Sequence, residues 1–323
     1  MSTQTRVLII KLAALGDMIQ ALGPMAAIRK HHSDAHITIM TTQPFADLLK
    51  ATGYCDAIWI DTKPKWYRIS PWLKLRRRLR EAKFSWVYDL QTSDRSSSYF
   101  HLFYPDKPPN WSGIAFGCSN LHANKKRDLM HTIDRQAEQL KICGIDEVPG
   151  LQAADMIWAD SDTSRFPLSE PFVLMVPGGA PHRPAKRWPV RHYTALAKIL
   201  VKGGITPVLL GTHSEGMMLD EITVNCPGAI NLCGLTSMLD LAALARRATA
   251  AIGNDTGPMH MIAITQCPAL VLFSKDSDPA LCAPRGEHVE IIRRDRLEDL
   301  SVDQVMNTLI DLAPGLETGL ELY

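Results

Sequence analysis

Residues 253–260, GNDTGPMH, bring a carboxylate, a hydroxyl, a flexible glycine and an imidazole together. They follow a short apolar run and precede another, a pattern that predicts a strand–turn–helix joint. Such a joint directs backbone N–H groups and the positive end of a helix dipole toward any anion placed there. We expect Thr256 and Gly257 to bind a phosphate, unless the segment simply turns a corner. Asp255 would repel an anion, so we expect it to cap the helix or to bond a sugar or ribose hydroxyl. His260 fits a packed or capping histidine as well as a phosphate or sugar contact.

Two further segments each contain a charged residue that could take part in a reaction. Asp17 follows an apolar run, and it suits either a helix N-cap or a base that takes a proton from a hydroxyl. Lys186 is either a solvated lysine or a cation over a departing diphosphate. Gly178 and Gly179 precede Lys186 and would let the backbone turn tightly beside a ligand. Of the neighbouring arginines Arg183 and Arg187, one is expected only to solvate the loop.

Alternating strands and helices must position these residues. In the first half the expected strands are 6–12, 36–41, 57–61 and 85–91, and the expected helices are 17–32, 44–52, 70–84 and 93–103. Pro24 should kink or end the first helix, and Ser70 and Pro71 should cap and open the third. In the second half the strands are 172–179, 205–212, 249–254 and 268–273, and the helices are 189–204, 237–248, 259–264 and 301–313. This order predicts two parallel sheets covered on both faces.

The pattern lapses over residues 144–170, which are rich in Pro, Asp and Ser. We therefore expect domains at 1–165 and 166–323, with the last helix a candidate to return to the first domain. Ligands of such sheets lie beyond the carboxyl ends of the strands, so a cleft between the two domains is the expected site.

Net charge, cysteine spacing and the length of apolar runs argue against several classes of protein. A formal net charge of +1 argues against nucleic acid, and seven scattered cysteines without a CxxC pair indicate buried, reduced thiols. No window has the apolar length of a membrane span, so we expect a cytoplasmic protein. The DSD at 276–278 resembles a metal motif of glycosyltransferases, but it recurs at 160–162 in the presumed linker. We expect no bound metal and no cofactor.

Four segments, IKLAALGDMIQALGP, HTIDR, VPGGAPHRPAKRWP and GNDTGPMH, stand in the order typical of glycosyltransferase family 9, which this chain resembles. The resemblance implies a GT-B fold, with two Rossmann-like domains and the donor nucleotide in the C-terminal one. It implies that Asp17 is the general base, that Lys186 stabilises the leaving diphosphate, and that Glu215 accepts a ribose hydroxyl. A solvated glutamate at a helix start is the alternative for Glu215. Ala13 and Ala14 replace the hydroxyl residues that many members carry before the Gly-Asp.

The resemblance implies an inverting transfer of a sugar, expected to be heptose from ADP-heptose, to a lipopolysaccharide-type acceptor. Arg77, in a basic helix, and Arg95 are the candidate contacts to this anionic glycolipid, and that helix suggests peripheral association with the inner membrane. A nucleotide-sugar epimerase of the same architecture and a catalytically silent nucleotide-sugar-binding protein are the alternatives.

Overall fold

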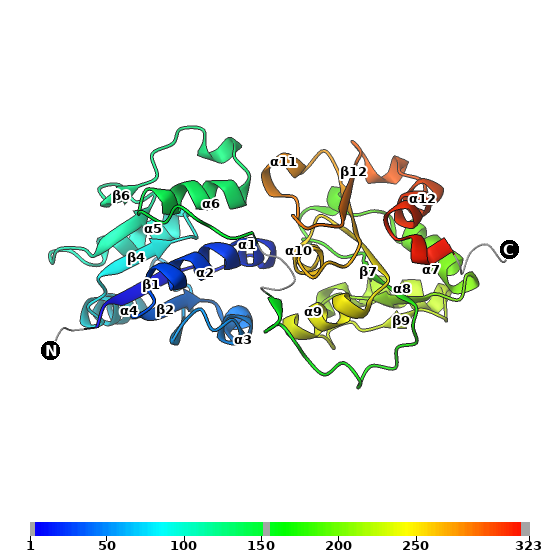
Figure 1. Cartoon of the computed structure of the whole chain (residues 1–323), viewed down its shortest axis with the longest axis horizontal. Coiled ribbons are helices and arrows are strands. Elements are labelled where there is room, and N and C mark those ends of the chain that lie inside the picture. Colours follow the sequence, from blue (N-terminus) through cyan, green and yellow to red (C-terminus); the bar gives the residue numbers. More distant parts are fainter. Residues whose placement is uncertain (1–3, 151–155, 318–323) are drawn as a thin grey trace. The chain divides into compact units, whose positions relative to one another are not determined.

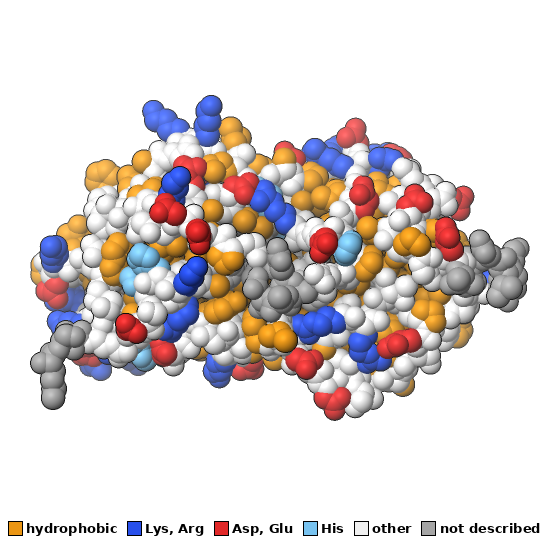
Figure 2. Space-filling view, viewed as in Figure 1, with side chains coloured by type: hydrophobic (Ala, Val, Ile, Leu, Met, Phe, Trp, Pro, Cys, Tyr) orange, Lys and Arg blue, Asp and Glu red, His pale blue; other side chains and the backbone are white. Residues whose placement is uncertain are grey.

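The computed structural model describes residues 4–150 and 156–317 (Figure 1). By internal contacts the chain divides into two compact units, residues 1–150 and 151–323. Each unit contains one six-stranded sheet whose strands are all parallel. On the face shown in Figure 2, basic and acidic side chains are interspersed over both units. Within the described ranges, no helix combines the length and apolar character needed to cross a bilayer.

The N-terminal unit is built around β1, whose residues after Arg6 are all buried. Its sheet has the order β3-β2-β1-β4-β5-β6, which reverses beside β1, between β1 and β4. The strands are β1 (Arg6–Ile10), β2 (His36–Thr41), β3 (Ala57–Ile60), β4 (Trp86–Asp89), β5 (Asn110–Gly113) and β6 (Asn120–Leu121). The helices are α1 (Leu15–Gln20), α2 (Leu22–His31), α3 (Ala46–Ala51), α4 (Ile69–Glu81), α5 (Asp94–His101) and α6 (Thr132–Lys141).

The C-terminal unit repeats the plan, with the sheet order β12-β11-β10-β7-β8-β9. Its strands are β7 (Phe172–Val176), β8 (Thr206–Leu209), β9 (Ile230–Asn231), β10 (Ala250–Asn254), β11 (Ala269–Phe273) and β12 (Val289–Arg293). Its helices are α7 (Val190–Lys202), α8 (Gly216–Asn225), α9 (Met238–Arg247), α10 (Gly257–Ala263), α11 (Pro279–Cys282) and α12 (Val302–Leu312). Short 3-10 turns at Pro184–Lys186 and His213–Glu215 follow β7 and β8.

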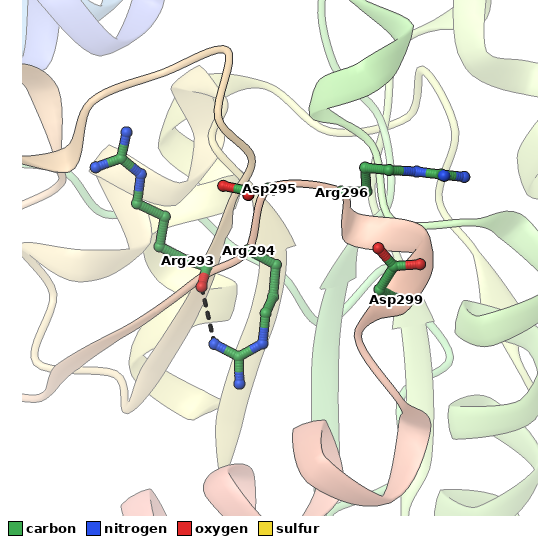
Figure 3. Close-up of a pocket in the computed structure, with 5 residues that line it drawn as sticks. All are labelled: Arg293, Arg294, Asp295, Arg296 and Asp299. Atoms are coloured by element: carbon green, nitrogen blue, oxygen red, sulfur yellow. Dashed lines mark hydrogen bonds between the residues drawn. The ribbon is translucent and has the colours of Figure 1, made fainter.

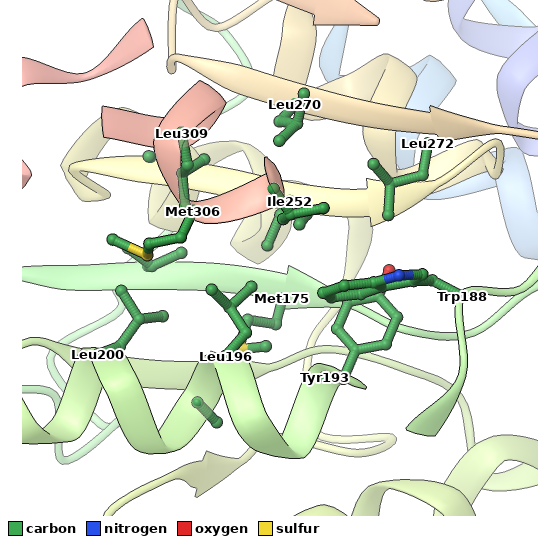
Figure 4. Packing of buried hydrophobic residues seen from close by; sticks show 14 of the residues in the cluster. Met175, Trp188, Tyr193, Leu196, Leu200, Ile252, Leu270, Leu272, Met306 and Leu309 are labelled. Carbon is green, nitrogen blue, oxygen red and sulfur yellow. The ribbon is translucent and has the colours of Figure 1, made fainter. Parts of the chain in front are cut away.

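Alternating side chains of β10 face opposite layers of helices. Ile252 lies in the core that Leu196 of α7 and Leu309 of α12 also line (Figure 4). The next residue, Gly253, faces the other way, where a Cβ atom would lie 2.6 Å from the sulfur of Met259 in α10. A glycine is therefore required for α10 to approach the strand, and this close approach places the β10–α10 joint at the end of the central strand.

Two expectations from the sequence need correction. α4 begins at Ile69, and its N-cap is Arg68 with no capping side chain, so Ser70 and Pro71 lie inside the first turn. α12 packs in the C-terminal core, and the return of this helix to the first domain stays a prediction. The division between units falls at residue 150 rather than 165.

The earlier division follows from contacts of the segment after residue 155. Arg246 of α9 donates hydrogen bonds to the carbonyl oxygens of Met156 and Ala159. Arg165 forms an ion pair with Asp240 of α9 at 2.5 Å. These contacts attach residues 156–165 to the C-terminal unit. The rest of the expected linker region at 151–155 lies outside the described residues.

Candidate functional site

Asn254, the last residue of β10, joins three segments of the C-terminal unit. Its side chain is fully buried. The amide nitrogen donates to the carbonyl oxygens of Pro177 and Gly178 at 2.8 and 3.0 Å. The amide oxygen accepts from the backbone N–H of Trp188 at 2.9 Å and from the Tyr193 hydroxyl at 3.2 Å. One side chain thus fixes the loop after β7 and the start of α7 against the end of β10. We did not single out Asn254 in the sequence, although a polar residue ending an apolar strand was a usable signal.

Lys186 and Asp255 form an ion pair at the same edge of the sheet. The Lys186 Nζ lies 2.5 Å from an Asp255 carboxylate oxygen, and the side chains are only 12% and 9% exposed. The N-cap of α10 is Thr256, and Asp255 does not cap this helix, so that alternative is wrong. The Thr256 side chain makes no capping hydrogen bond. A cation held by one carboxylate in a partly dry site can be shared with an incoming anion, because the ammonium group has three donors.

Glu215 braces the glycine turn after β7. Its Oε1 accepts the backbone N–H of Gly179 at 2.9 Å, and its Oε2 accepts the N–H and hydroxyl of Thr212 at 2.8 and 2.9 Å. A Cβ atom at Gly178 would lie 1.7 Å from the carboxylate, so only glycine allows this contact. Glu215 is therefore more than a solvated residue at a helix start, while its role as a ribose contact stays a prediction.

The arginines of the β7–α7 loop differ in their contacts. Arg187 donates from Nη2 to the carbonyl oxygens of Gly179 and Ala180 at 2.8 and 3.0 Å, so it holds the turn in shape. Arg183 is exposed, and its guanidinium forms no hydrogen bond or ion pair with another residue in the described ranges. His260 is 7% exposed and lies in α10, within the same unit as Lys186. The structure therefore places the predicted donor-binding residues in the loops and helix starts that follow β7, β8 and β10 of the C-terminal sheet.

The loop that carries Asp17 follows β1 at the corresponding edge of the N-terminal sheet. Gln91, after β4, accepts the backbone N–H groups of Leu12 and Ala13 at 2.8 and 3.2 Å. Asp17 is the third residue of α1, is half-buried, and accepts the Ala14 N–H through Oδ2 at 3.2 Å. The N-cap of α1 is Ala14, so the expectation that Asp17 is itself the N-cap is wrong, and Asp17 instead accepts the N–H of the N-cap residue from the third helical position. The second oxygen, Oδ1, makes no hydrogen bond with a described residue and remains able to accept a proton.

Two buried ionisable residues that we did not predict, Lys11 and Asp89, lie beneath this loop. Lys11 is 3% exposed, and its Nζ donates to the carbonyl oxygen of Leu90 at 3.2 Å. Burial lowers the pKa of Lys11, while the negative charges of Asp17 and Asp89 act to raise it. Asp89 ends β4 and is fully buried, and this burial raises the pKa of its carboxyl to about 6. Each lies at the end of an apolar run, which was the available signal in the sequence.

The acceptor candidates of the N-terminal unit have separate surroundings. Arg95 of α5 donates from both terminal nitrogens to the carbonyl oxygen of Pro64 at 3.3 Å. Its guanidinium lies 5.8 Å from the ring centroid of Trp72. Arg77 lies on the exposed side of α4 and pairs with Glu81 at 3.5 Å. Arg95 therefore braces the β3–α4 loop, whereas Arg77 belongs to the basic surface of α4.

A hollow at the end of β12 gathers Arg293, Arg294, Asp295, Arg296 and Asp299. Figure 3 shows that the three guanidinium groups point in different directions, and that Arg294 donates to the carbonyl oxygen of Arg293. Arg296 also pairs with Glu298 at 2.6 Å. The three guanidinium groups do not converge on one point, as the binding of a single anion would require.

Comparison with known proteins places these features in one family. The chain is 31% identical over 149 residues to lipooligosaccharide heptosyltransferase 2 of Haemophilus influenzae, an alignment that spans 43% of each protein. It is 26% identical over 308 residues to lipopolysaccharide heptosyltransferase 2 of Escherichia coli K12, covering 89% of this chain and 88% of that relative.

The solved structures confirm the expected fold. The structure of E. coli ADP-heptose lipopolysaccharide heptosyltransferase II matches with a TM-score of 0.77 and 23% identity, over 97% of this chain and 100% of that one. The sequence profile of glycosyltransferase family 9 (heptosyltransferase) matches residues 116–308, which is more than half of the chain. The chain therefore belongs to glycosyltransferase family 9, as its four ordered segments predicted.

Proposed function

We propose that this chain is an inverting glycosyltransferase that moves heptose from ADP-heptose to a lipopolysaccharide core acceptor. The observation that carries the proposal is the Lys186–Asp255 ion pair at the end of β10, beside a glycine turn, in a chain of this family. The pair supplies a positive charge for a diphosphate without leaving a lone cation in a partly dry site. The names of the relatives supply the sugar and the acceptor.

In the proposed reaction, Asp17 accepts the proton of an acceptor hydroxyl while that oxygen attacks the anomeric carbon of the donor. A new carbon–oxygen bond forms, the bond to the diphosphate breaks, and ADP departs with the electron pair. The free Oδ1 of Asp17 is the atom suited to take the proton. Direct attack from the face opposite the leaving group inverts the anomeric centre.

The donor contacts follow from the C-terminal unit. Lys186 stabilises the charge that grows on the departing diphosphate, assisted by the Thr256 hydroxyl and the Gly257 amide. Glu215 is proposed to accept a ribose hydroxyl, and Arg183 and His260 are proposed to contact phosphate or sugar. Asp255 is proposed to keep Lys186 in place rather than to touch the anion. No bound metal is needed in this scheme, because Lys186 carries the countercharge.

The acceptor is a glycolipid, so we also propose that the enzyme works at the cytoplasmic face of the inner membrane as a peripheral protein. The basic helix α4 supports the proposal, since cations near an anionic surface contribute about 1 kcal/mol each. Arg77 and Arg95 are proposed to attract the anionic acceptor to this unit.

The test is a transfer assay with purified protein, ADP-heptose and a core acceptor that lacks the heptose, read by mass spectrometry. We expect one heptose to be added with ADP-heptose, and markedly less sugar transfer with GDP- or UDP-linked sugars. Isomerisation of the donor without an acceptor would instead favour the epimerase. Donor binding without transfer to any acceptor would favour a silent binding protein. The family match supports the transferase over both.

A further inference from the structure

The loop from β3 to α4 and the start of α4 expose four large apolar side chains. Trp66, Tyr67, Ile69 and Leu73 are 85%, 56%, 71% and 58% exposed. Ile69 and Leu73 lie one turn apart on the same side of α4, directly after the aromatic pair. We call these four residues the β3–α4 patch. Isolated exposed apolar residues are ordinary, but four within eight positions form a candidate contact surface.

The backbone under the β3–α4 patch is anchored, so the exposure does not come from a loosely held loop. The carbonyl oxygen of Lys65 accepts the Trp72 indole N–H at 3.2 Å and the Arg68 N–H at 2.9 Å. The carbonyl oxygen of Pro64 accepts both terminal nitrogens of Arg95. These bonds fix the turn on the buried side and leave the apolar side chains on the outer side.

Cations outnumber carboxylates around the β3–α4 patch. Residues 62–80 contain eight Lys and Arg residues and no Asp or Glu, although the whole chain has a net charge of only +1. Arg80 is neutralised by Asp106, and Arg78 stacks on Trp59. In contrast, the exposed cations Lys63, Arg68 and Lys74 pair with no carboxylate in the described part of the chain.

We propose that the β3–α4 patch is a docking surface for an anionic lipid bilayer, with Trp66, Tyr67, Ile69 and Leu73 entering the headgroup region. Tryptophan and tyrosine favour that region because their rings are apolar with one polar edge. Unpaired cations beside them gain lipid phosphates as partners. A protein partner fits less well, because the centres of protein interfaces are depleted of lysine.

The position of the patch connects it to the proposed reaction, on which this inference rests. The loop follows the carboxyl end of β3, and the loop carrying Asp17 follows β1 at the same edge of the same parallel sheet. A bilayer at the β3–α4 patch would bring lipid-anchored acceptors to that edge. Docking would therefore raise the local concentration of acceptor without adding a contact to the reacting sugar.

The test compares vesicle binding of the wild type with that of a Trp66→Ser/Ile69→Ser variant, by co-sedimentation with phosphatidylglycerol-containing and pure phosphatidylcholine vesicles. We expect the wild type to favour the anionic vesicles and the variant to bind them at least about tenfold more weakly. The matched control is Met217→Ser, because Met217 is 91% exposed in the other unit and should leave binding unchanged. A Lys63→Glu/Lys74→Glu variant should also bind more weakly, and high salt should abolish its difference from the wild type.

Wild-type protein that ignores anionic vesicles, or a Trp66→Ser/Ile69→Ser variant that binds them normally, would overturn the inference. Sedimentation analysis could instead show that the patch joins two copies of the chain. If the substitutions also left vesicle binding unchanged, these results would overturn the inference. Activity separates this inference from the proposed function. The variant should be normal with a soluble, deacylated acceptor and impaired with an acceptor embedded in vesicles. Patch-dependent vesicle binding without transfer to either acceptor would remove the proposed function and leave the docking surface.

Discussion

The joints that follow β1 and β10 each leave a central strand of their sheet but differ in how their carboxylates are paired. Each joint leaves a central parallel strand and enters a helix, α1 or α10. After β10, the Asp255 carboxylate is held at 2.5 Å by Lys186. After β1, the Asp17 carboxylate accepts only a backbone N–H in the described residues, and the nearby Lys11 directs its ammonium group to a carbonyl oxygen.

The difference shows how one fold supplies two kinds of chemistry. A carboxylate neutralised by a lysine cannot serve easily as a base, but it keeps a cation in position for an anionic ligand. A carboxylate with one free oxygen can accept a proton. The topology places both joints at strand ends, and the partners of each carboxylate determine what the joint can do.

Replacing Asp17 by Asn should have the largest effect on turnover. The amide keeps an oxygen for the Ala14 N–H and loses the proton acceptor, so we expect the single-turnover rate of sugar transfer to fall by about 10³-fold. The thermal unfolding midpoint should stay close to that of the wild type. A transfer rate within a factor of about three of the wild type would remove Asp17 from the proposed mechanism.

Replacing Lys186 by Ala should reduce kcat/KM by about 10²-fold, because the donor loses a cation and meets the bare Asp255 carboxylate. The double variant Lys186→Ala/Asp255→Asn removes that repulsion and should recover part of the donor affinity. A double-mutant cycle of kcat/KM measures the coupling. Strictly additive losses would show that Asp255 does not act through Lys186.

Asn254→Ala should lower the free energy of unfolding, because Asn254 holds together the joint that follows β10. The substitution removes four hydrogen bonds of a fully buried side chain and leaves their partners unsatisfied, so we expect a loss of about 4 kcal/mol in the free energy of unfolding. Urea denaturation gives this value. Asn225→Ala is the matched control, since in the described part of the chain its side chain makes one hydrogen bond, to the carbonyl oxygen of Glu221, which is exposed and should contribute little. Equal losses in both variants would contradict the role assigned to Asn254.

The pH dependence of the free energy of unfolding tests the burial of Asp89 beside the joint that follows β1. Burial raises the pKa of Asp89 to about 6, above its ordinary value of 3.8. Its contribution to stability is therefore fully present below pH 4 and is lost as the pH rises through 6. The stability of the wild type minus that of Asp89→Asn should fall by up to about 3 kcal/mol from pH 4 to pH 7. His32 has a pKa lowered to about 4 by burial, so its own contribution to stability rises with pH. Because His32 is present in both proteins, subtracting the two stabilities leaves the contribution of Asp89. A constant difference would show that Asp89 keeps an ordinary pKa.

The sequence predicted the strands and helices better than it predicted which side chains contact one another. Long apolar runs such as β7 and β11 are recognisable because a strand buried on both faces is apolar throughout. The strands β5, β6, β9 and β12 were missed, since the first three are short and contain Asn, Ser or Gly, and Glu290 interrupts the apolar run of β12. The family segments and the strand ends located the site loops.

The pairing inside those loops could not be read from the sequence. Lys186 and Asp255 are 69 positions apart, and they meet only because β7 and β10 are neighbours in the sheet. The same adjacency gives Asn254 its partners, and the adjacency of β1 and β4 brings Asp89 to the loop carrying Asp17. Pattern reasoning identifies strands, but not which strands are adjacent.

Calorimetric titration of ADP into the wild type, Asp17→Asn and Lys186→Ala tests most directly the claim that the two joints have separate roles. The account predicts equal ADP affinity for the wild type and Asp17→Asn, and an affinity at least about tenfold lower for Lys186→Ala. Wild-type affinity in Lys186→Ala, or loss of ADP binding in Asp17→Asn, would contradict it.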